Sequence, residues 1–236
     1  MRIIVTAGPT REYLDPVRFL SNPSTGKMGF AIAAEAARRG HEVTLVAGPV
    51  ALKTPEKVHR VNVTWAREML KAVREAMVGR AVPARRGAPR RRALPQSVVF
   101  ISTAAVADWR PAKCAAKKLK KGEMSGVLRL VRNPDILKTI ARLRRRAETS
   151  RPTVAGLRLV GFAAETNDVL KEAVRKCREK GLEFIVANDV TQKGCGFGTD
   201  TNRVTFVFPD GTQRKFPLMT KRMVAKRILE EIEHEA

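Results

Sequence analysis

The alternation of short apolar segments with stretches of helical periodicity is the feature that most constrains the fold of this chain. Strands are expected at residues 2–6, 42–47, 58–63, 97–102, 127–131, 154–162 and 183–187. Helices are expected at residues 27–39, 65–77, 168–180 and 219–233, and one more begins after residue 135. This alternation predicts an α/β fold: a Rossmann-like, doubly wound, mostly parallel sheet with helices on both faces. A turn at Asp210-Gly211 adds a small antiparallel hairpin near the C-terminus.

The chain is expected to form a single domain, residues 1–236. A chain of 236 residues can bury a full core as one α/β unit, and nothing in the sequence requires a second one. Residues 79–96 interrupt the repeat with Gly, Pro and six arginines in place of apolar periodicity. They are expected to be a basic surface insertion: a solvated loop is favoured, and contact with RNA or an acidic partner is the alternative.

The charge of the chain indicates an anionic partner. The 46 Lys and Arg residues against 23 Asp and Glu give a net charge of +23, which suits a nucleotide, a phosphorylated metabolite or a nucleic acid. The basic runs lack the interleaved aromatic residues that stack on single-stranded bases, so nucleic-acid binding is the weaker hypothesis. Steep salt dependence of binding to DNA or RNA would distinguish it.

The cysteines and the apolar segments indicate in which cellular compartment the protein is expected. Cys114, Cys177 and Cys195 lie far apart without a C-x-x-C pair, so neither a disulfide framework nor a zinc site is indicated. The first residues do not resemble a signal peptide, and no apolar run approaches the roughly 20 residues that cross a bilayer. We therefore expect a cytoplasmic protein without a membrane partner.

The turn at residues 21–29, which opens the first long helix, is a candidate anion site. Ser, Asn, Thr, two Gly and a Lys gather where a helix leaves backbone N–H groups unpaired at the positive end of its dipole. Such a turn suits a phosphate or a carboxylate. An ordinary helix cap followed by a tight helix–strand contact explains these residues equally well.

Two further candidates lie at the ends of strands. Asp108 follows a run of small residues after the strand at 97–102, and open parallel sheets bind ligands at the carboxyl ends of their strands. It could instead cap a helix or pair with Arg110. Phe162 ends its strand and could stack on a base, although an aromatic residue there is more often part of the core.

Lysines supply the remaining candidates. Lys176 and Lys180 are four residues apart, so they share one face of a helix, where two ammonium groups suit a phosphate chain. The lysines of residues 113–121 suit a flexible polyphosphate-binding flap, and solvation explains them nearly as well.

Several common chemistries lack their signatures. No G-x-G-x-x-G follows the first strand, which disfavours a nicotinamide-dependent oxidoreductase, and no G-x-x-x-x-G-K-[ST] occurs. His41, His59 and His234 lie away from the strand ends, so neither Ser-His-acid catalysis nor a His-based metal site is indicated. A mechanism driven by binding through lysines, amides and backbone donors remains.

Six motifs follow one another along most of the chain. They are Asp15-Pro16-Val17-Arg18 through Ser21-Asn22 and Gly26-Lys27-Met28-Gly29, Ala104-Ala105-Val106-Ala107-Asp108, Lys118-Leu119-Lys120-Lys121, Asn133-Pro134-Asp135-Ile136, Gly161-Phe162-Ala163-Ala164-Glu165-Thr166, and Ala187-Asn188-Asp189. Together they resemble the phosphopantothenoylcysteine synthetase family, the ligase half of a bacterial bifunctional coenzyme A enzyme. The decarboxylase half would lie before residue 1, so a separate decarboxylase is an expected partner.

The resemblance implies a stand-alone, usually homodimeric ligase that uses a nucleoside triphosphate and Mg²⁺. The carboxylate of 4′-phosphopantothenate attacks the α-phosphate to give an acyl nucleotide, and the amine of L-cysteine then displaces the nucleoside monophosphate. CTP is favoured over ATP because the motifs at 26–29 and 133–136 look bacterial. The resemblance leaves the metal ligands unknown. The alternative function is a non-catalytic nucleic-acid-binding or nucleotide-binding Rossmann-like protein.

The resemblance also implies roles for individual residues. Asn22 matches the asparagine that contacts the acyl nucleotide and supports its conversion to product, and Arg18 matches the arginine expected at the intermediate or at the partner subunit's substrate. Lys118 matches the flap lysine required for the first half-reaction. Ala104 matches a position whose backbone lines the substrate site. Nucleotide-binding positions are matched by Asp108, Phe162, Lys176 and Lys180.

Overall fold

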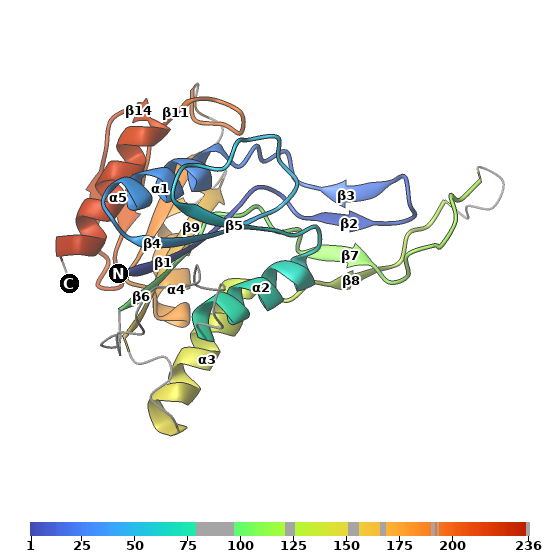
Figure 1. The fold of residues 1–236 in the computed structure, drawn as a ribbon, viewed down its shortest axis with the longest axis horizontal. Helices are drawn as coiled ribbons and strands as arrows, with labels where there is room; N and C mark the ends of the chain where they lie inside the picture. The colour runs from blue at the N-terminus through green and yellow to red at the C-terminus, as the bar shows by residue number, and fades with distance from the viewer. Residues whose placement is uncertain are drawn as a thin grey trace, which may run out of the picture.

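A mixed sheet of eight strands forms the centre of the molecule (Figure 1). The computed structural model describes residues 1–78, 97–120, 126–150, 156–165, 169–189, 192 and 194–234, so the predicted insertion at 79–96 lies outside the described residues. The strands run in the order β13-β12-β10-β9-β6-β1-β4-β5. Their bounds are β1 Arg2–Ala7, β4 Glu42–Ala47, β5 Val58–Asn62, β6 Val98–Ser102, β9 Leu157–Glu165, β10 Phe184–Asp189, β12 Thr205–Val207 and β13 Gln213–Lys215.

The order of the strands places a topological switch at the centre of the sheet. All neighbours from β5 across to β10 are parallel, and the β12–β13 hairpin joins antiparallel at one edge. From β1 the chain builds outward through β4 and β5, and then returns to add β6, β9 and β10 on the other side of β1. The direction of building therefore reverses between β1 and β6, as in doubly wound nucleotide-binding sheets. The predicted fold class, including the C-terminal hairpin, is confirmed.

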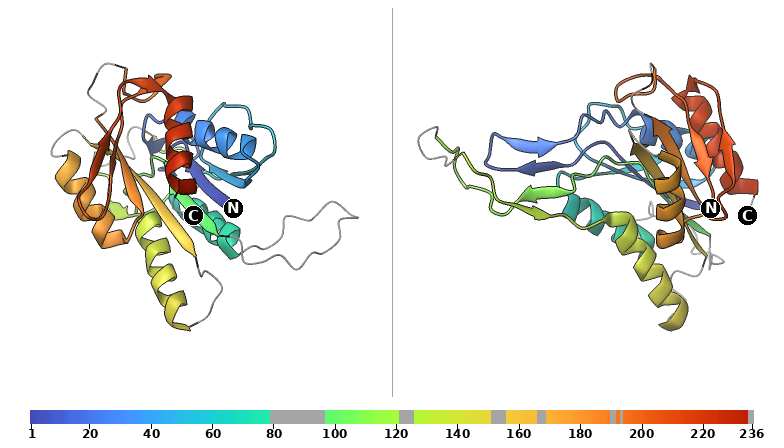
Figure 2. Two further views of the ribbon diagram at one scale, coloured as in Figure 1. Left: turned by 90° about the vertical axis from the view of Figure 1, so that its left-hand side faces the viewer. Right: turned by 180° about the vertical axis from the view of Figure 1, so that it is seen from behind.

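Helices cover both faces of the sheet (Figure 2). They are α1 Lys27–Arg38, α2 Ala66–Val78, α3 Ile136–Ser150, α4 Val169–Lys180 and α5 Lys221–His234. Helices α1 and α5 pack on one face, where Phe30 and Ile228 belong to the same buried cluster. The other face is covered by α2, α3 and α4, which bury Met69, Ile140 and Cys177 together. Because both faces are covered, the central strands are nearly continuous apolar runs.

Two hairpins project together from the body of the molecule (Figure 1). In the first, β2 (Arg11–Tyr13) pairs with β3 (Phe19–Ser21); in the second, β7 (Trp109–Pro111) pairs with β8 (Leu130–Arg132). We call residues 11–21, 109–120 and 126–132 the arm. The strand expected at 127–131 is β8, which belongs to the arm and not to the main sheet. The hairpin at 11–21 was not predicted, because strands of three residues show too little alternation to detect.

The remaining elements close the C-terminal part of the fold. A short antiparallel pair, β11 (Thr201–Asn202) and β14 (Met219–Thr220), precedes α5. In the described part of the chain, no helix combines the length and the apolar character needed to cross a membrane.

Candidate functional site

A cavity of about 600 Å³ opens at the carboxyl ends of β6 and β9, where a doubly wound sheet is expected to bind its ligand. Four of the sequence-predicted site residues line it: Ala104, Asp108, Phe162 and Lys180. The start of α3 forms the opposite wall, with residues 133–138. The N-terminus of a helix presents unpaired backbone N–H groups, so this wall is suited to an anion.

Lys180 and Asp135 join α4 to the start of α3 across this cavity. The Lys180 Nζ donates to Asp135 Oδ2 at 2.8 Å, and Asp135 Oδ1 accepts the backbone N–H of Lys138 at 2.8 Å, which caps the helix. Burial raises the pKa of Asp135, but the hydrogen bonds from Lys180 and from the Lys138 backbone outweigh it, so its pKa lies below the ordinary value. Asp135 therefore carries a negative charge beside the lysine ammonium at neutral pH.

Asp108 is an exposed carboxylate on the rim of this cavity. Of its two predicted alternative roles, a helix cap and a pair with Arg110, the second is not seen, because the Arg110 guanidinium donates to the carbonyl of Arg132 and to Asn133 Oδ1. Asn133 in turn donates from Nδ2 to the Ala107 carbonyl at 2.8 Å. These bonds fix the backbone on either side of Asp108, which lines the cavity together with residues 133–138.

A smaller cavity, of about 170 Å³, lies beside the larger one and shares two of its wall residues, Ala104 and Phe162. Its walls also include residues 24–29, so the turn predicted to bind an anion lines a cavity next to the switch point between β1 and β6. Phe162 is half-buried and packs against the core as well, so both predicted roles for it are compatible with its position.

Two glycines shape the turn that lines the smaller cavity. Gly26 has φ +78°, a left-handed conformation that glycine adopts without strain, and it precedes α1 without a side-chain cap. Gly29 allows the helix to approach the sheet closely: a Cβ there would lie 2.5 Å from Ala7 Cβ and from Thr103 Oγ1. The tight helix–strand contact that was weighed as an alternative is present, and the same turn also lines the smaller cavity.

Asn22 and Ala104 are brought close together by the loop after β6. Asn22 is half-buried, and its Nδ2 donates to the carbonyl of Ala105 at 3.1 Å. Two threonines accept hydrogen bonds from the same loop. The Ala104 N–H donates to Thr6 Oγ1 at 3.3 Å, and the Ala107 N–H donates to Thr10 Oγ1 at 3.0 Å. The backbone beside the two cavities is therefore fixed by β1 and the turn that follows it.

Arg18 and Lys118 lie on the arm, outside the walls of both cavities. The Arg18 guanidinium binds the buried Asp15 carboxylate, with Nη2 to Oδ2 at 2.5 Å, and also donates to the Leu119 carbonyl at 2.8 Å. Asp15 Oδ2 accepts the Leu119 N–H at 3.2 Å. The hydrogen bond from Arg18 keeps the pKa of Asp15 well below its usual range. Both backbone polar groups of the residue after Lys118 are thus anchored by one ion pair.

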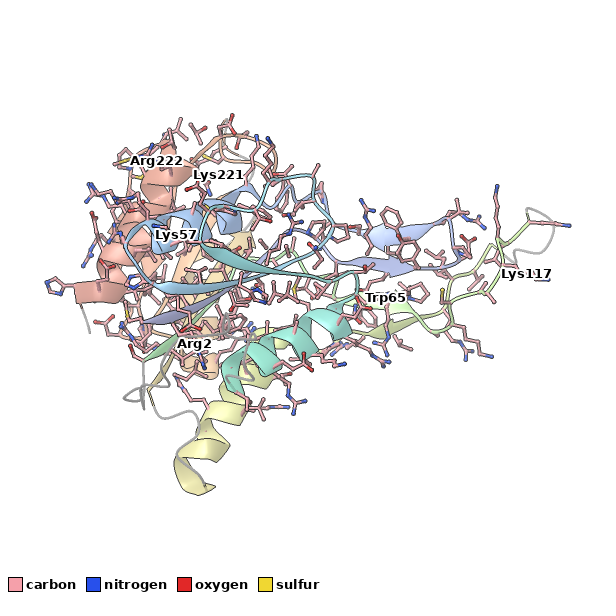
Figure 3. The ribbon with its side chains drawn as sticks, viewed as in Figure 1. Arg2, Lys57, Trp65, Lys117, Lys221 and Arg222 are labelled. Atoms are coloured by element: carbon pink, nitrogen blue, oxygen red, sulfur yellow. The ribbon has the colours of Figure 1, made fainter. Side chains whose placement is uncertain are left out.

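Lys118 itself is exposed. Its neighbour Lys117 lies far out along the arm, away from the sheet (Figure 3). Lys176 is half-buried one turn before Lys180 on α4 and is not part of the cavity wall. The structure therefore gathers Asn22 and four other predicted residues around the cavities and places Arg18, Lys118 and Lys176 farther away.

Three charged residues of the cavities escaped the sequence analysis as individual candidates. Asp135 appeared only within a motif, although Asp in the turn before a helix is a recognisable cap signal. Lys27 and Lys221 each begin a helix and line the smaller cavity. No sequence pattern could have paired them, because they converge only when α1 packs against α5.

No group of three or more His, Cys, Asp or Glu side chains able to hold a metal ion occurs among the described residues. The larger cavity nevertheless offers two carboxylates, Asp108 and Asp135. Oxygen ligands of this kind suit Mg²⁺, which is usually held by one or two carboxylates together with the phosphates of its substrate.

A family model and a sequence relative match almost the whole chain. The model of the DNA/pantothenate metabolism flavoprotein C-terminal domain matches residues 1–84 and 88–235. The coenzyme A biosynthesis bifunctional protein CoaBC of Escherichia coli K12 is 46% identical over 235 residues, which cover 98% of this chain and 51% of that protein. The chain thus spans about half the length of the curated relatives it matches.

Solved structures extend the comparison to the fold. The crystal structure of the C-terminal domain of a CoaBC protein has a TM-score of 0.74 and 40% identity, and the match covers 99% of this chain and 94% of that one. A Cab2 mutant in complex with phosphopantothenate-cysteine has a TM-score of 0.71 and 16% identity, covering 99% and 88%. At that identity the likeness to Cab2 concerns the fold alone.

Proposed function

The chain belongs to the DNA/pantothenate metabolism flavoprotein C-terminal domain family, and from this membership we propose that it is a ligase of coenzyme A biosynthesis. It joins 4′-phosphopantothenate to L-cysteine through an amide bond. The observation that carries the proposal is the 46% identity to CoaBC of Escherichia coli across nearly the whole chain. The ligand-sized cavity at the carboxyl ends of β6 and β9 supports it, and nothing favours the nucleic-acid-binding alternative.

The proposed reaction has two steps. A carboxylate oxygen of 4′-phosphopantothenate attacks the α-phosphorus of a nucleoside triphosphate, and pyrophosphate leaves to give an acyl nucleotide. The amine of cysteine then attacks the acyl carbon, loses a proton, and expels the nucleoside monophosphate. The phosphate anhydride supplies the activation, so the protein needs no nucleophilic side chain. Its task is to position the reactants and to stabilise charge through lysines and backbone donors.

The larger cavity is proposed to hold the nucleotide. Phe162 offers a ring face for the base, while the α3 N-terminus and Lys180 offer donors for phosphate oxygens. Lys180 is now engaged with Asp135, so a phosphate entering the cavity would share or replace that contact. Asp108 and Asp135 would hold Mg²⁺, whose charge helps to neutralise the triphosphate. CTP is preferred to ATP in this proposal, on the bacterial character of the motifs at 26–29 and 133–136.

Asn22 and the backbone of Ala104 are proposed to face the acyl group. Ala104 lines both cavities, and Asn22 donates to the carbonyl of its neighbour Ala105. Lys176 is proposed to approach the triphosphate from the turn before Lys180. For Lys118 to neutralise the triphosphate, its segment must change position or serve the cavity of a second copy, because the arm holds it away from the cavity walls.

A homodimer is proposed because the arm exposes an unusual number of large apolar side chains. More than a third of each of these side chains is exposed to solvent: Val17, Phe19, Trp109, Val127, Leu128 and Leu130. Exposed large apolar side chains gathered on one projecting segment are typical of an interface. A second copy covering the arm would also bring Arg18 and Lys118 of one copy near the other. Sedimentation of Leu128→Glu should show a monomer with an unchanged circular dichroism spectrum; a dimer of unchanged affinity would contradict this arrangement.

Pyrophosphate release by the purified chain tests the proposed function. With 4′-phosphopantothenate and Mg²⁺, release should occur in the absence of cysteine, faster with CTP than with ATP, and should continue through many turnovers once cysteine is added. Omitting 4′-phosphopantothenate is the matched control. Pyrophosphate release at the same rate without 4′-phosphopantothenate, or no release with either nucleotide, would contradict the proposal. A decarboxylase is the proposed consumer of the amide product.

A further inference from the structure

The smaller cavity is closed on one side by a glycine-rich loop, residues 194–199, that follows β10. Cys195, Gly196 and Phe197 of this loop line the cavity opposite the turn at residues 24–29. Gly194 and Gly198 have φ values of +84° and +86°, so the loop depends on conformations that few other residues adopt. Glycine adopts these values without strain, and threonine hydroxyls add bonds within the loop: Thr199 Oγ1 donates to the Gly196 carbonyl at 2.8 Å and Thr201 Oγ1 to the Gly194 carbonyl at 2.7 Å.

Two lysine ammonium groups hold the loop from neighbouring helices. The Lys27 Nζ donates to the Gly198 carbonyl at 2.7 Å and pairs with Asp200 Oδ1 at 2.7 Å. The Lys221 Nζ donates to the Thr199 carbonyl at 2.6 Å, and the backbone N–H of Lys221 donates to the Asp200 carbonyl at 2.9 Å. Three consecutive residues, 198–200, are thus bound by the first residues of α1 and α5.

Considered for stability alone, a positive charge is unfavourable at the N-termini of α1 and α5. Lys27 and Lys221 each stand at the N-terminus of a helix, where the dipole disfavours positive charge. Lys221 is buried, with 9% of its surface exposed. Burial, and then the neighbouring charge of Lys27, lowers the pKa of Lys221, while Asp200 opposes the shift. Figure 3 shows Lys221 at the end of α5 that lies beside α1.

We propose that Lys221 is a positioning residue that, together with Lys27, latches the glycine-rich loop against the smaller cavity and so sets how tightly that cavity holds its part of the substrate. The second half of this statement rests on the proposed function, whereas the latch itself does not. An ammonium group suits the task because it offers three donors, so it can hold a loop carbonyl and still face the cavity. Lys221 lies beside the cavity and touches no reacting group in this arrangement.

Cys195 supplies a direct readout of the latch. Cys195 lies in the loop and is only 2% exposed, whereas Cys114 is exposed and Cys177 is a buried residue of α4. A maleimide can therefore reach Cys195 only when the loop opens, and its labelling rate follows the population of the open form. Mass spectrometry of the peptides separates the three thiols, so the measurement needs neither substrate nor activity.

The test compares Lys221→Met with Lys221→Arg and with Arg222→Met, an exposed neighbour on the same helix. Lys221→Met should label Cys195 at least about tenfold faster than wild type, the loss expected for one charge-assisted hydrogen bond. Lys221→Arg should recover most of the protection, and Arg222→Met should match wild type. Unchanged Cys195 labelling in a folded Lys221→Met variant would overturn the proposal. Should that variant fail to fold, Lys27→Met carries the same expectation.

A kinetic measurement tests whether the latch affects substrate binding. In pyrophosphate release with CTP and 4′-phosphopantothenate, Lys221→Met should raise KM for one of the two substrates about tenfold or more while kcat changes little, and Lys221→Arg should restore KM. Faster labelling with unchanged KM would overturn the link to substrate. If wild type releases no pyrophosphate, the proposed function fails, and the labelling result still decides the latch.

Discussion

Replacing Gly29 with alanine tests how closely α1 approaches the sheet beside the smaller cavity. At an unobstructed position in a helix the change would stabilise the protein by about 1 kcal/mol, because alanine has the higher helix propensity. At Gly29 the new Cβ would lie 2.5 Å from Ala7 Cβ and from Thr103 Oγ1, and 3.0 Å from the Thr6 carbonyl oxygen. Three contacts at once place the cost near the upper end of the overpacking range, about 3 kcal/mol. The net loss should be about 2 kcal/mol.

Urea denaturation followed by circular dichroism measures this loss, and thermal denaturation should show a fall in Tm of about 4–8 °C for a chain of this size. Ala34→Gly is the control, because Ala34 is exposed on the same helix and its replacement measures only the difference in helix propensity between alanine and glycine. This variant should lose about 1 kcal/mol of unfolding free energy. A Gly29→Ala variant as stable as wild type, or more stable, would refute the packing described here, because propensity alone would then account for it.

The remaining predictions concern the reaction and acid stability. Asn22→Asp should accumulate acyl nucleotide while still releasing pyrophosphate, and equal loss of both half-reactions in quenched single turnovers would argue against its role. Lys118→Gln should suppress pyrophosphate release itself; full activity would remove Lys118 from the first step. The hydrogen bond from Arg38, with that from Arg39, outweighs burial and lowers the pKa of Glu35 to about 2. Its stabilisation is complete above the unfolded-state value of 4.5 and is lost as the pH falls toward 2, so the urea midpoint of Glu35→Gln should vary less than that of wild type across this range.

The main sheet could be predicted from the sequence because its strands are buried on both faces. A run such as residues 98–101 is apolar throughout, and a segment of helical periodicity separates most of these runs from the next one, which is the alternation typical of a doubly wound sheet. The arm was predicted only in part: a strand was expected where β8 lies, but neither its pairing with β7 nor the hairpin at 11–21 was predicted. Its strands are three residues long and expose apolar side chains, which reverses the usual relation between sequence pattern and burial.

The candidate site was predictable where it depends on position along a strand or helix. Asp108 follows β6 and Phe162 lies near the end of β9, so both reach the carboxyl edge of the sheet, where they line the cavity. Contacts between segments that are distant in the sequence were not predictable. Lys180 binds Asp135, which is 45 residues away in the sequence, and Lys27 binds Gly198, which is 171 residues away. Helical spacing correctly put Lys176 and Lys180 on one helix, but only packing decides that Lys180 alone of the two lines the cavity.

The path of a carboxylate oxygen tests the central claim most directly. The purified chain would convert 4′-phosphopantothenate labelled with ¹⁸O in its carboxylate, together with cysteine, Mg²⁺ and CTP, and mass spectrometry would locate the label in the products. An acyl nucleotide requires one carboxylate oxygen to leave bound to the α-phosphorus, so the account predicts ¹⁸O in the nucleoside monophosphate. Label in orthophosphate, or amide formed without labelled nucleoside monophosphate, would contradict it.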